Sequence, residues 1–313
     1  MRALVVDQGR VSHRTDRPEA APAEGEVNVA VHLAGICATD LEIQAGYMGF
    51  AGVPGHEFVG VARGGRLAGR RVVGEINAAC GRCDRCARGM DRHCADRTVL
   101  GIVGRDGAFA ESLSLPERNL HALPDAISDE SAVFVEPLAA AFAIFEQVEI
   151  PAGTRVAVLG DGKLGLLCAL ALASRGARVS ITGRHDRKLA IARRAGAEVL
   201  ASDAKGSFPV VVEATGSGAG LARALELVEP RGTIVLKTTT HAAPPESLAR
   251  LVVDEVRVVG SRCGRFGPAI EALASGRIDP RPLVDDRFAL ARGAEAFARA
   301  AAPGTLKVLL EVA

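Results

Sequence analysis

The sequence predicts an α/β protein in which a β-rich domain accompanies a doubly wound parallel sheet. Three observations predict it: the first part of the chain holds short β-rich runs, the middle part alternates apolar strands with helical segments, and a glycine-rich loop at 160–165 joins one of those strands to a helix. With 313 residues, 48% of them hydrophobic, the chain is long enough to build a core in each domain.

The region up to about residue 128 is predicted to be mainly β. Its runs are short and are separated by Gly, Pro and charged turns, and the run at 26–35 alternates apolar with more polar residues. Alternation of this kind places one face of a strand on a core. We expect strands at 3–6, 26–35, 58–62, 70–76 and 109–115. Such strands form a barrel-like or sandwich-like domain.

From about residue 129 to 264 the pattern changes to strands that alternate with helices, which predicts a parallel sheet covered on both faces. The predicted strands are 155–160, 178–182, 198–201, 209–215, 232–237 and 255–261. The predicted helices lie at 166–176, at 186–196, in a segment ending at 227, and near 246–253. The tail is predicted to hold helices at 268–276 and 291–301 and a last strand at 306–312.

Each glycine of the loop at 160–165 has a physical reason to be there. Gly160 permits a tight turn, Gly162 lets the backbone approach a pyrophosphate, and Gly165 lets the helix pack on the strand. The helix N-terminus offers free N–H groups and a positive dipole end to phosphates. The remaining candidate contacts of the loop are Lys163 and Leu164. Because a strand and a helix flank the loop in the required order, we predict a Rossmann-type dinucleotide site.

The end of the next strand predicts which dinucleotide binds. NAD-binding proteins place an acid about 20 residues past the glycine loop for the ribose 2′-OH, whereas a 2′-phosphate requires arginine without that acid. Gly183 stands where the acid is expected, and Arg184 follows with a planar fork suited to phosphate, next to His185. The pattern predicts NADP. In the alternative, Asp186 is the acid or caps the helix, and NAD binds. Thr215, after a later strand, is predicted either to contact the nucleotide or to shape a turn.

Composition excludes several classes of protein. The net charge of +1 and the scattered arginines argue against nucleic-acid binding. No apolar run reaches the roughly 18 residues of a membrane span, because Glu136 and Pro137 interrupt the run at 132–147. The N-terminus lacks the apolar stretch of a signal peptide. Seven mostly clustered cysteines suit metal ligation in a reducing compartment. We expect a cytoplasmic protein without nucleic-acid or membrane partners.

A first group of residues predicts a catalytic zinc site. Such a site uses three protein ligands and leaves one position open for water or substrate. Cys37 and His56 supply two ligands. The third is Glu57, beside His56, or Glu136, a carboxylate inside an apolar run where charge is rarely tolerated without a partner or a metal. The alternative for each residue alone is structural, with the cysteine in a core and the histidine in a turn.

A second group predicts a structural zinc site. Four cysteines lie close together in the chain, at Cys80, Cys83, Cys86 and Cys94. They can enclose one tetrahedral ion with no open position. Their spacing differs from the ferredoxin runs that bind iron–sulfur clusters, and four unligated thiols would form an oxidisable patch. We therefore predict zinc holding a lobe at about 80–94 that is too small and too polar for a core.

Taken together, these motifs resemble the zinc-dependent medium-chain alcohol dehydrogenase/reductase family. They occur in the family's order along essentially the whole chain, as GICATD at 35–40, GHE at 55–57, the four-cysteine lobe, EPLA at 136–139, VLGDGKLG at 158–165 and VVEATGS at 211–217. The glutamate of EPLA, where liver-type members have a ligand cysteine, resembles the sorbitol, glucose and threonine dehydrogenase branch. The resemblance implies a GroES-like β-rich catalytic domain from residues 1–128 and 265–313, and a central Rossmann domain at 129–264.

The resemblance also implies roles for single residues of the zinc site. Cys37 and His56 would bind the catalytic zinc. Glu57 and Glu136 would be alternative carboxylates, one bound directly and the other acting from farther away or through water. Asp40 would accept a hydrogen bond from His56 and fix its ring.

The implied activity is hydride transfer between NADP(H) and an alcohol/carbonyl pair. Zinc would act as the Lewis acid and Thr39 would relay the substrate proton. The branch implies a polyol or sugar-like substrate, two zinc ions per chain, and a homodimer or homotetramer paired through the apolar strand at 255–260. Two alternatives are a zinc-free quinone or enoyl reductase, which needs no zinc ligands, and a non-catalytic NADP(H)-binding sensor that keeps the fold.

Overall fold

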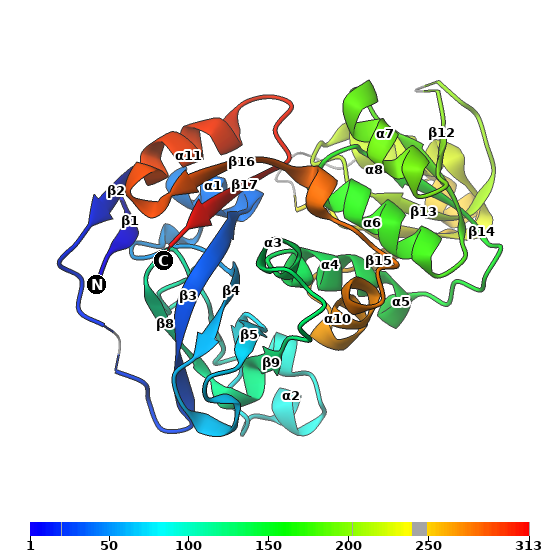
Figure 1. Ribbon diagram of the computed structural model, residues 1–313. Helices are drawn as coiled ribbons and strands as arrows, with labels where there is room; N and C mark the ends of the chain where they lie inside the picture. Colours follow the sequence, from blue (N-terminus) through cyan, green and yellow to red (C-terminus); the bar gives the residue numbers. More distant parts are fainter. Residues whose placement is uncertain (20, 202, 240–248, 313) are drawn as a thin grey trace. The chain divides into compact units, whose positions relative to one another are not determined.

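The computed structural model describes residues 1–19, 21–201, 203–239 and 249–312. The chain forms two compact units (Figure 1). The β unit contains Met1–Glu136 and Asp279–Ala313, and the parallel-sheet unit contains Pro137–Ile278. Helix α4 (Val135–Phe142) therefore crosses the boundary between them. The β unit is assembled from both ends of the chain.

A seven-stranded sheet forms the core of the β unit. Its order is β16-β17-β3-β4-β5-β9, and β8 also pairs with β3. The strands are β3 (Glu26–Ile36), β4 (Glu57–Ala62), β5 (Arg71–Gly74), β8 (Ser112–Pro116), β9 (Leu120–Ala122), β16 (Val284–Ala289) and β17 (Lys307–Glu311). Gly35 of β3 pairs with Leu309 of β17 on one side and with Glu57 of β4 on the other. The last strand of the chain thus lies beside the strand ends that carry the first predicted zinc ligands.

The predicted strands of the N-terminal region are confirmed, and the β unit also contains elements that the sequence did not predict. The strand predicted at 3–6 is β1 (Ala3–Asp7), which forms a two-stranded sheet with β2 (Arg10–Arg14). The sequence did not indicate β2, β16 or the helices α1 (Ala38–Gln44) and α3 (Asp129–Ala132). Helix α11 (Gly293–Ala301) lies where a helix was predicted and packs on β2, β16 and β17.

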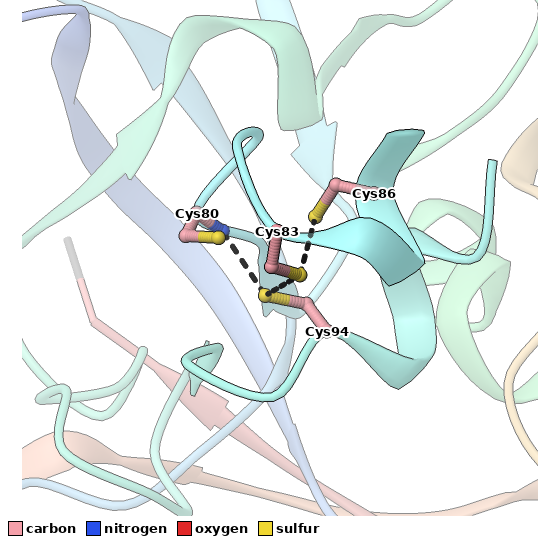
Figure 2. Close-up of side chains that lie close together, drawn as sticks. All are labelled: Cys80, Cys83, Cys86 and Cys94. Carbon is pink, nitrogen blue, oxygen red and sulfur yellow. Dashed lines mark hydrogen bonds between the residues drawn. The ribbon is translucent and has the colours of Figure 1, made fainter. Parts of the chain in front are cut away.

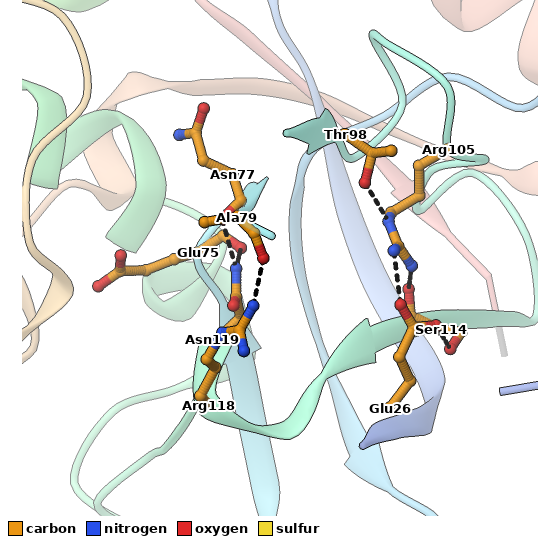
Figure 3. Close-up of polar contacts among 9 residues, drawn as sticks. All are labelled: Glu26, Glu75, Asn77, Ala79, Thr98, Arg105, Ser114, Arg118 and Asn119. Carbon is orange, nitrogen blue, oxygen red and sulfur yellow. Dashed lines mark hydrogen bonds and ion pairs between the residues drawn. The ribbon is translucent and has the colours of Figure 1, made fainter. Parts of the chain in front are cut away.

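The four cysteines lie in a small lobe with little regular structure. It contains β6 (Asn77–Ala78), α2 (Asp84–Ala87), a 3-10 helix (Asp91–His93) and β7 (Thr98–Val99), and β6 pairs with β7. Figure 3 shows how polar contacts tie this lobe to the sheet. The Asn119 side chain donates to the carbonyls of Glu75 at 2.7 Å and Asn77 at 2.9 Å, and the Arg118 guanidinium donates to the carbonyl of Ala79. A second group comprises Glu26, Thr98, Arg105 and Ser114.

The parallel-sheet unit contains six parallel strands in the order β12-β11-β10-β13-β14-β15. They are β10 (Arg155–Leu159), β11 (Arg178–Thr182), β12 (Glu198–Val199), β13 (Phe208–Glu213), β14 (Val228–Leu236) and β15 (Arg257–Gly260). The order reverses at β10, the strand that leads into the glycine loop. The predicted doubly wound sheet is confirmed.

Five predicted helices lie in this unit: α6 (Lys163–Ser174), α7 (Asp186–Arg194), α8 (Ala219–Leu227), α9 (Ala249–Val253) and α10 (Phe266–Ala274). Helix α6 packs on β10, β11 and β13, and α8 packs on β10, β13 and β14. The first three positions of the helix predicted near 246–253 lie outside the described residues. The sequence did not indicate α4 or α5 (Ile144–Gln147). Within the described ranges, every helix is too short or too polar to cross a membrane.

Candidate active site

The four lobe cysteines point toward one another (Figure 2). The Cys83 sulfur lies 3.6 Å from the Cys86 sulfur and 3.8 Å from the Cys94 sulfur, and the Cys80 N–H donates to the Cys94 sulfur at 3.3 Å. All four sulfurs lie within 4.8 Å of one another. A tetrahedral zinc with Zn–S bonds of about 2.3 Å separates its sulfurs by about 3.8 Å. The donor set therefore fits one zinc ion with closed coordination.

The protonation of these thiols depends on their neighbours. Backbone N–H groups of Cys86 and Ala95 lower the pKa of the Cys83 thiol to about 6. Burial and the neighbouring Cys83 sulfur raise the pKa of Cys86 to about 12. Sulfurs this close cannot all be ionised unless a cation lies between them. A bound cation would allow all four to be thiolates.

The second group joins the ends of two strands. Cys37 follows β3 and precedes α1, while His56 and Glu57 lie at the start of β4. One ligand atom from each of the three side chains lies within 4.8 Å of the others. The pairing of Gly35 with Glu57 in the sheet explains this, because it places the end of β3 beside the start of β4. Glu136, half-buried at the start of α4, is not a member of this group.

One buried carboxylate connects the two ligand-bearing segments. Asp40 accepts a hydrogen bond from the Cys37 N–H at 2.8 Å and another from the Gly55 N–H at 3.1 Å. The same carboxylate lies 3.5 Å from Nδ1 of His56. Burial opposes protonation of His56, but the charge of Asp40 and the polar contacts with Asp40 and Cys37 together outweigh it, so the pKa of the imidazole lies above its usual value. The contact between Asp40 and Nδ1 does not have hydrogen-bond geometry, and Nδ1 of the buried His56 has no hydrogen-bond partner within the described residues. The hydrogen bond from His56 to Asp40 that the resemblance implies is therefore absent here, and metal binding would keep the histidine neutral.

Thr39 lies in the first turn of α1, beside the predicted ligand cysteine. Its Oγ1 is 3.9 Å from the Cys37 sulfur, and its side chain is half-buried. The Thr39 hydroxyl therefore lies beside the predicted ligand sulfur.

Lys307, a residue that the sequence did not indicate, pairs with Glu57. Both side chains are 1% exposed, and the Lys307 ammonium forms an ion pair with the Glu57 carboxylate. The ammonium also lies 5.5 Å from the centroid of the Phe134 ring. Gly35, on the strand between them, makes room: a Cβ there would lie 2.8 Å from the Glu57 carboxylate and 3.3 Å from Cδ of Lys307. The sequence feature that could have indicated this buried pair is the lysine within the apolar strand predicted at 306–312.

The glycine loop has the close contacts that its sequence predicts. Gly160 has a φ of +111°, and its N–H donates to the Thr182 carbonyl at 3.1 Å. A Cβ on Gly165 would lie 2.1 Å from the Gly160 carbonyl oxygen. A Cβ on Gly162 would meet nothing within 4 Å, so that position faces open space at the start of α6. The other two loop residues, Lys163 and Leu164, form the first turn of α6.

The other predicted nucleotide contacts lie at the carboxyl ends of strands. Gly183 follows β11, and Arg184 and His185 after it are exposed. Thr215 follows β13 and is also exposed, with its hydroxyl donating to the buried Glu213 carboxylate at 2.6 Å. Carboxyl ends at the reversal of strand order are where such sheets bind ligands.

Comparison with known proteins identifies the family. Residues 23–125 match the alcohol dehydrogenase GroES-like domain, and residues 164–275 match the zinc-binding dehydrogenase domain. A 2-dehydro-3-deoxy-L-galactonate 5-dehydrogenase of Pseudoalteromonas atlantica is 30% identical, over 93% of this chain and 93% of its own. The chain belongs to the zinc-type medium-chain alcohol dehydrogenase family. This alcohol dehydrogenase is an oxidoreductase of CH–OH groups that uses a nicotinamide cofactor, and the predicted family is confirmed.

Solved structures of the same fold hold either nicotinamide cofactor. A short chain alcohol dehydrogenase (rspB) from Escherichia coli CFT073, complexed with NADH, has a TM-score of 0.91 and 27% identity, covering 99% of each chain. A putative zinc-binding dehydrogenase from Sinorhizobium meliloti 1021, bound to NADP, has a TM-score of 0.88 and 28% identity, covering 99% of this chain and 98% of that one. The fold of this alcohol dehydrogenase therefore does not by itself determine the cofactor.

Proposed function

We propose that this alcohol dehydrogenase holds two zinc ions per chain and transfers a hydride between NADP(H) and a polyol or sugar-like alcohol. The catalytic zinc would be held by Cys37, His56 and Glu57, and the structural zinc by the four lobe cysteines. The observation that carries the proposal is the grouping of three ligand atoms within 4.8 Å beside a carboxylate that ties both segments together. Glu136 is the alternative third ligand, and it lies outside that group.

Each residue around the proposed site would have a separate role in the oxidation of an alcohol. Zinc bound there would supply a Lewis acid that lowers the pKa of the substrate hydroxyl, and the nicotinamide would supply the hydride acceptor. Thr39 would accept the proton of that hydroxyl at Oγ1 and release its own hydroxyl proton to water, since its side chain is only half-buried. Asp40 places a negative charge beside the His56 ring. Lys307 neutralises the negative charge of Glu57. Glu57 would then offset less of the positive charge of the bound zinc ion, and the ion would polarise the substrate oxygen more strongly.

The proposed preference for NADP(H) rests on the turn after β11. Gly183 carries no side chain that would repel a 2′-phosphate, and the exposed Arg184 guanidinium is available to form two parallel hydrogen bonds to it. The proposed substrate class agrees with the sugar-acid dehydrogenase activity named for the Pseudoalteromonas relative.

The proposal includes a homodimer, or a dimer of such dimers, formed through β15. This strand is at the edge of the six-stranded sheet, and Val258 on it is 40% exposed. An uncovered apolar edge strand favours pairing with a second copy.

Metal analysis and cofactor titration test the proposal together. Protein purified without chelator is expected to contain two zinc ions per chain and to bind NADPH more tightly than NADH, measured by fluorescence of the reduced nicotinamide. One zinc per chain, released only on unfolding, would favour the zinc-free reductase. Two zinc ions with no turnover across a broad panel of alcohols and polyols would favour the sensor.

Two glycine substitutions separate the roles of the loop. Gly165→Ala places a Cβ against the Gly160 carbonyl, and we expect it to lower the free energy of unfolding by about 1–3 kcal/mol, the usual range for overpacking. Gly162→Ala fills open space, so the melting temperature is expected to change little while NADPH binding weakens at least tenfold, because the backbone can no longer approach the pyrophosphate. Calorimetry and fluorescence titration measure the two effects. Equal NADPH affinity for Gly162→Ala and wild type would contradict this role.

A further inference from the structure

Asp161, the second residue of the glycine loop, reaches the turn that is proposed to contact the cofactor ribose. Its Oδ2 accepts hydrogen bonds from the Arg184 N–H at 2.9 Å and the His185 N–H at 2.8 Å, and lies 2.9 Å from Nδ1 of the His185 ring. The parallel pairing of β10 with β11 brings the loop beside this turn, because Leu159 and Thr182 are neighbours at the strand ends. One carboxylate therefore connects two segments that would both contact the nucleotide.

Asp161 occupies the space that a side chain at position 183 would need. A Cβ on Gly183 would lie 2.4 Å from Cβ of Asp161 and 2.7 Å from its Oδ2. An acid at the end of β11 and this conformation of Asp161 are thus mutually exclusive. The chain lacks the usual strand-end acid, but it places a carboxylate from the loop in the same neighbourhood.

The Asp161 carboxylate is held in its charged form. Its side chain is 12% exposed. Burial opposes ionisation, but hydrogen bonds from the His185 ring and from the N–H groups of His185 and Arg184 outweigh it, and the pKa of Asp161 lies below its usual value. A 2′-phosphate bound by this turn would meet a fixed negative charge and two N–H groups that already have an acceptor. By contrast, a ribose hydroxyl could donate to Oδ1, since the three hydrogen bonds fall on Oδ2.

We propose that Asp161 is the residue that limits this enzyme's preference for NADP(H) over NAD(H). Arg184 and Asp161 are then opposing determinants, the first favouring the 2′-phosphate and the second favouring the 2′-hydroxyl. The inference rests on the proposed function only in that a nicotinamide dinucleotide binds at the glycine loop. It does not require that wild type prefers NADPH.

The test compares Asp161→Asn with Asp186→Asn. Asparagine keeps an oxygen that accepts from the two N–H groups but removes the charge. Asp186, three residues after Gly183, is the matched control, because its side chain is 95% exposed and its substitution removes the same charge at the start of α7, next to the turn. Dissociation constants for NADPH and NADH are measured by fluorescence in binary complexes of the zinc-loaded enzyme. We expect the ratio of the NADH constant to the NADPH constant to rise at least tenfold in Asp161→Asn and to change less than twofold in Asp186→Asn.

Two results would overturn the inference. The first is an unchanged ratio in Asp161→Asn, and the second is an equal rise in Asp186→Asn, which would make Asp186 the discriminating acid. If Asp161→Asn does not fold, Asp161→Ser is measured in the same way and judged by the same ratio. If wild type binds NADH more tightly than NADPH, the proposed NADP(H) preference is contradicted. A tenfold rise of the same ratio in Asp161→Asn would still support the inference in that case. Wild type that binds neither cofactor would overturn both.

Discussion

Replacing Cys94 with serine is expected to remove one zinc ion per chain and to unfold the lobe around it. Cys94 is fully buried, and its sulfur is adjacent to Cys83 and accepts from the Cys80 N–H. Structural zinc contributes about 10–16 kcal/mol of binding free energy in small domains that have no core of their own. The loss of one of the four ligands removes part of this binding free energy. We therefore expect the free energy of unfolding to fall by roughly 3 kcal/mol or more. Metal analysis and denaturant unfolding measure the two effects.

Cys168→Ser is the matched control for Cys94→Ser. Cys168 is another fully buried cysteine, but it lies in the middle of α6, where burial raises the pKa of its thiol to about 11. Its replacement buries a hydroxyl among apolar side chains and is expected to cost about 1–3 kcal/mol without changing the zinc content. Full zinc content in Cys94→Ser would show that the four sulfurs do not share an ion.

The features predicted correctly from the sequence are mostly those encoded locally. The spacing of Cys80, Cys83 and Cys86 brings the sulfurs of one short loop together whatever the rest of the chain does. The glycine loop likewise contains its own strand, turn and helix. The alternation in 26–35 predicted β3, and the strands alternating with helices predicted the parallel sheet.

The missed features depend on contacts between distant parts of the chain. Lys307 and Glu57 are 250 positions apart, and only the register of β17, β3 and β4 brings them together across Gly35. In the sequence, Asp161 is a loop residue between two glycines with no visible role, and only the pairing of β10 with β11 places it beside Arg184.

Two missed elements have a different cause. The apolar run that forms α4 contains Glu136 and Pro137, and a proline within such a run argues against a continuous helix, so the run did not predict one. Strand β16 carries Asp285, Asp286 and Arg287 in sequence and lacks the apolar alternation that predicts a strand.

Lys307→Met is expected to lower the free energy of unfolding of the zinc-depleted protein by about 3–5 kcal/mol, because it leaves the Glu57 carboxylate buried without a counter-charge. Combining it with Glu57→Gln is expected to recover most of the loss, since the unpaired charge is then gone. Lys188→Met is the matched control: Lys188 is 6% exposed on α7, and no ion pair involves it within the described residues. We expect its replacement to change stability by less than about 1 kcal/mol.

The same substitution tests which carboxylate serves the catalytic zinc. If Glu57 is a ligand, the ion supplies the positive charge that Lys307→Met removes, so the loss of stability should be clearly smaller in zinc-loaded protein than in zinc-depleted protein. Both proteins lose the lobe zinc on depletion, so that contribution cancels in the comparison between Lys307→Met and wild type. A loss of the same size with and without zinc would mean that the ion does not reach Glu57, and Glu136 would then be the carboxylate to replace next.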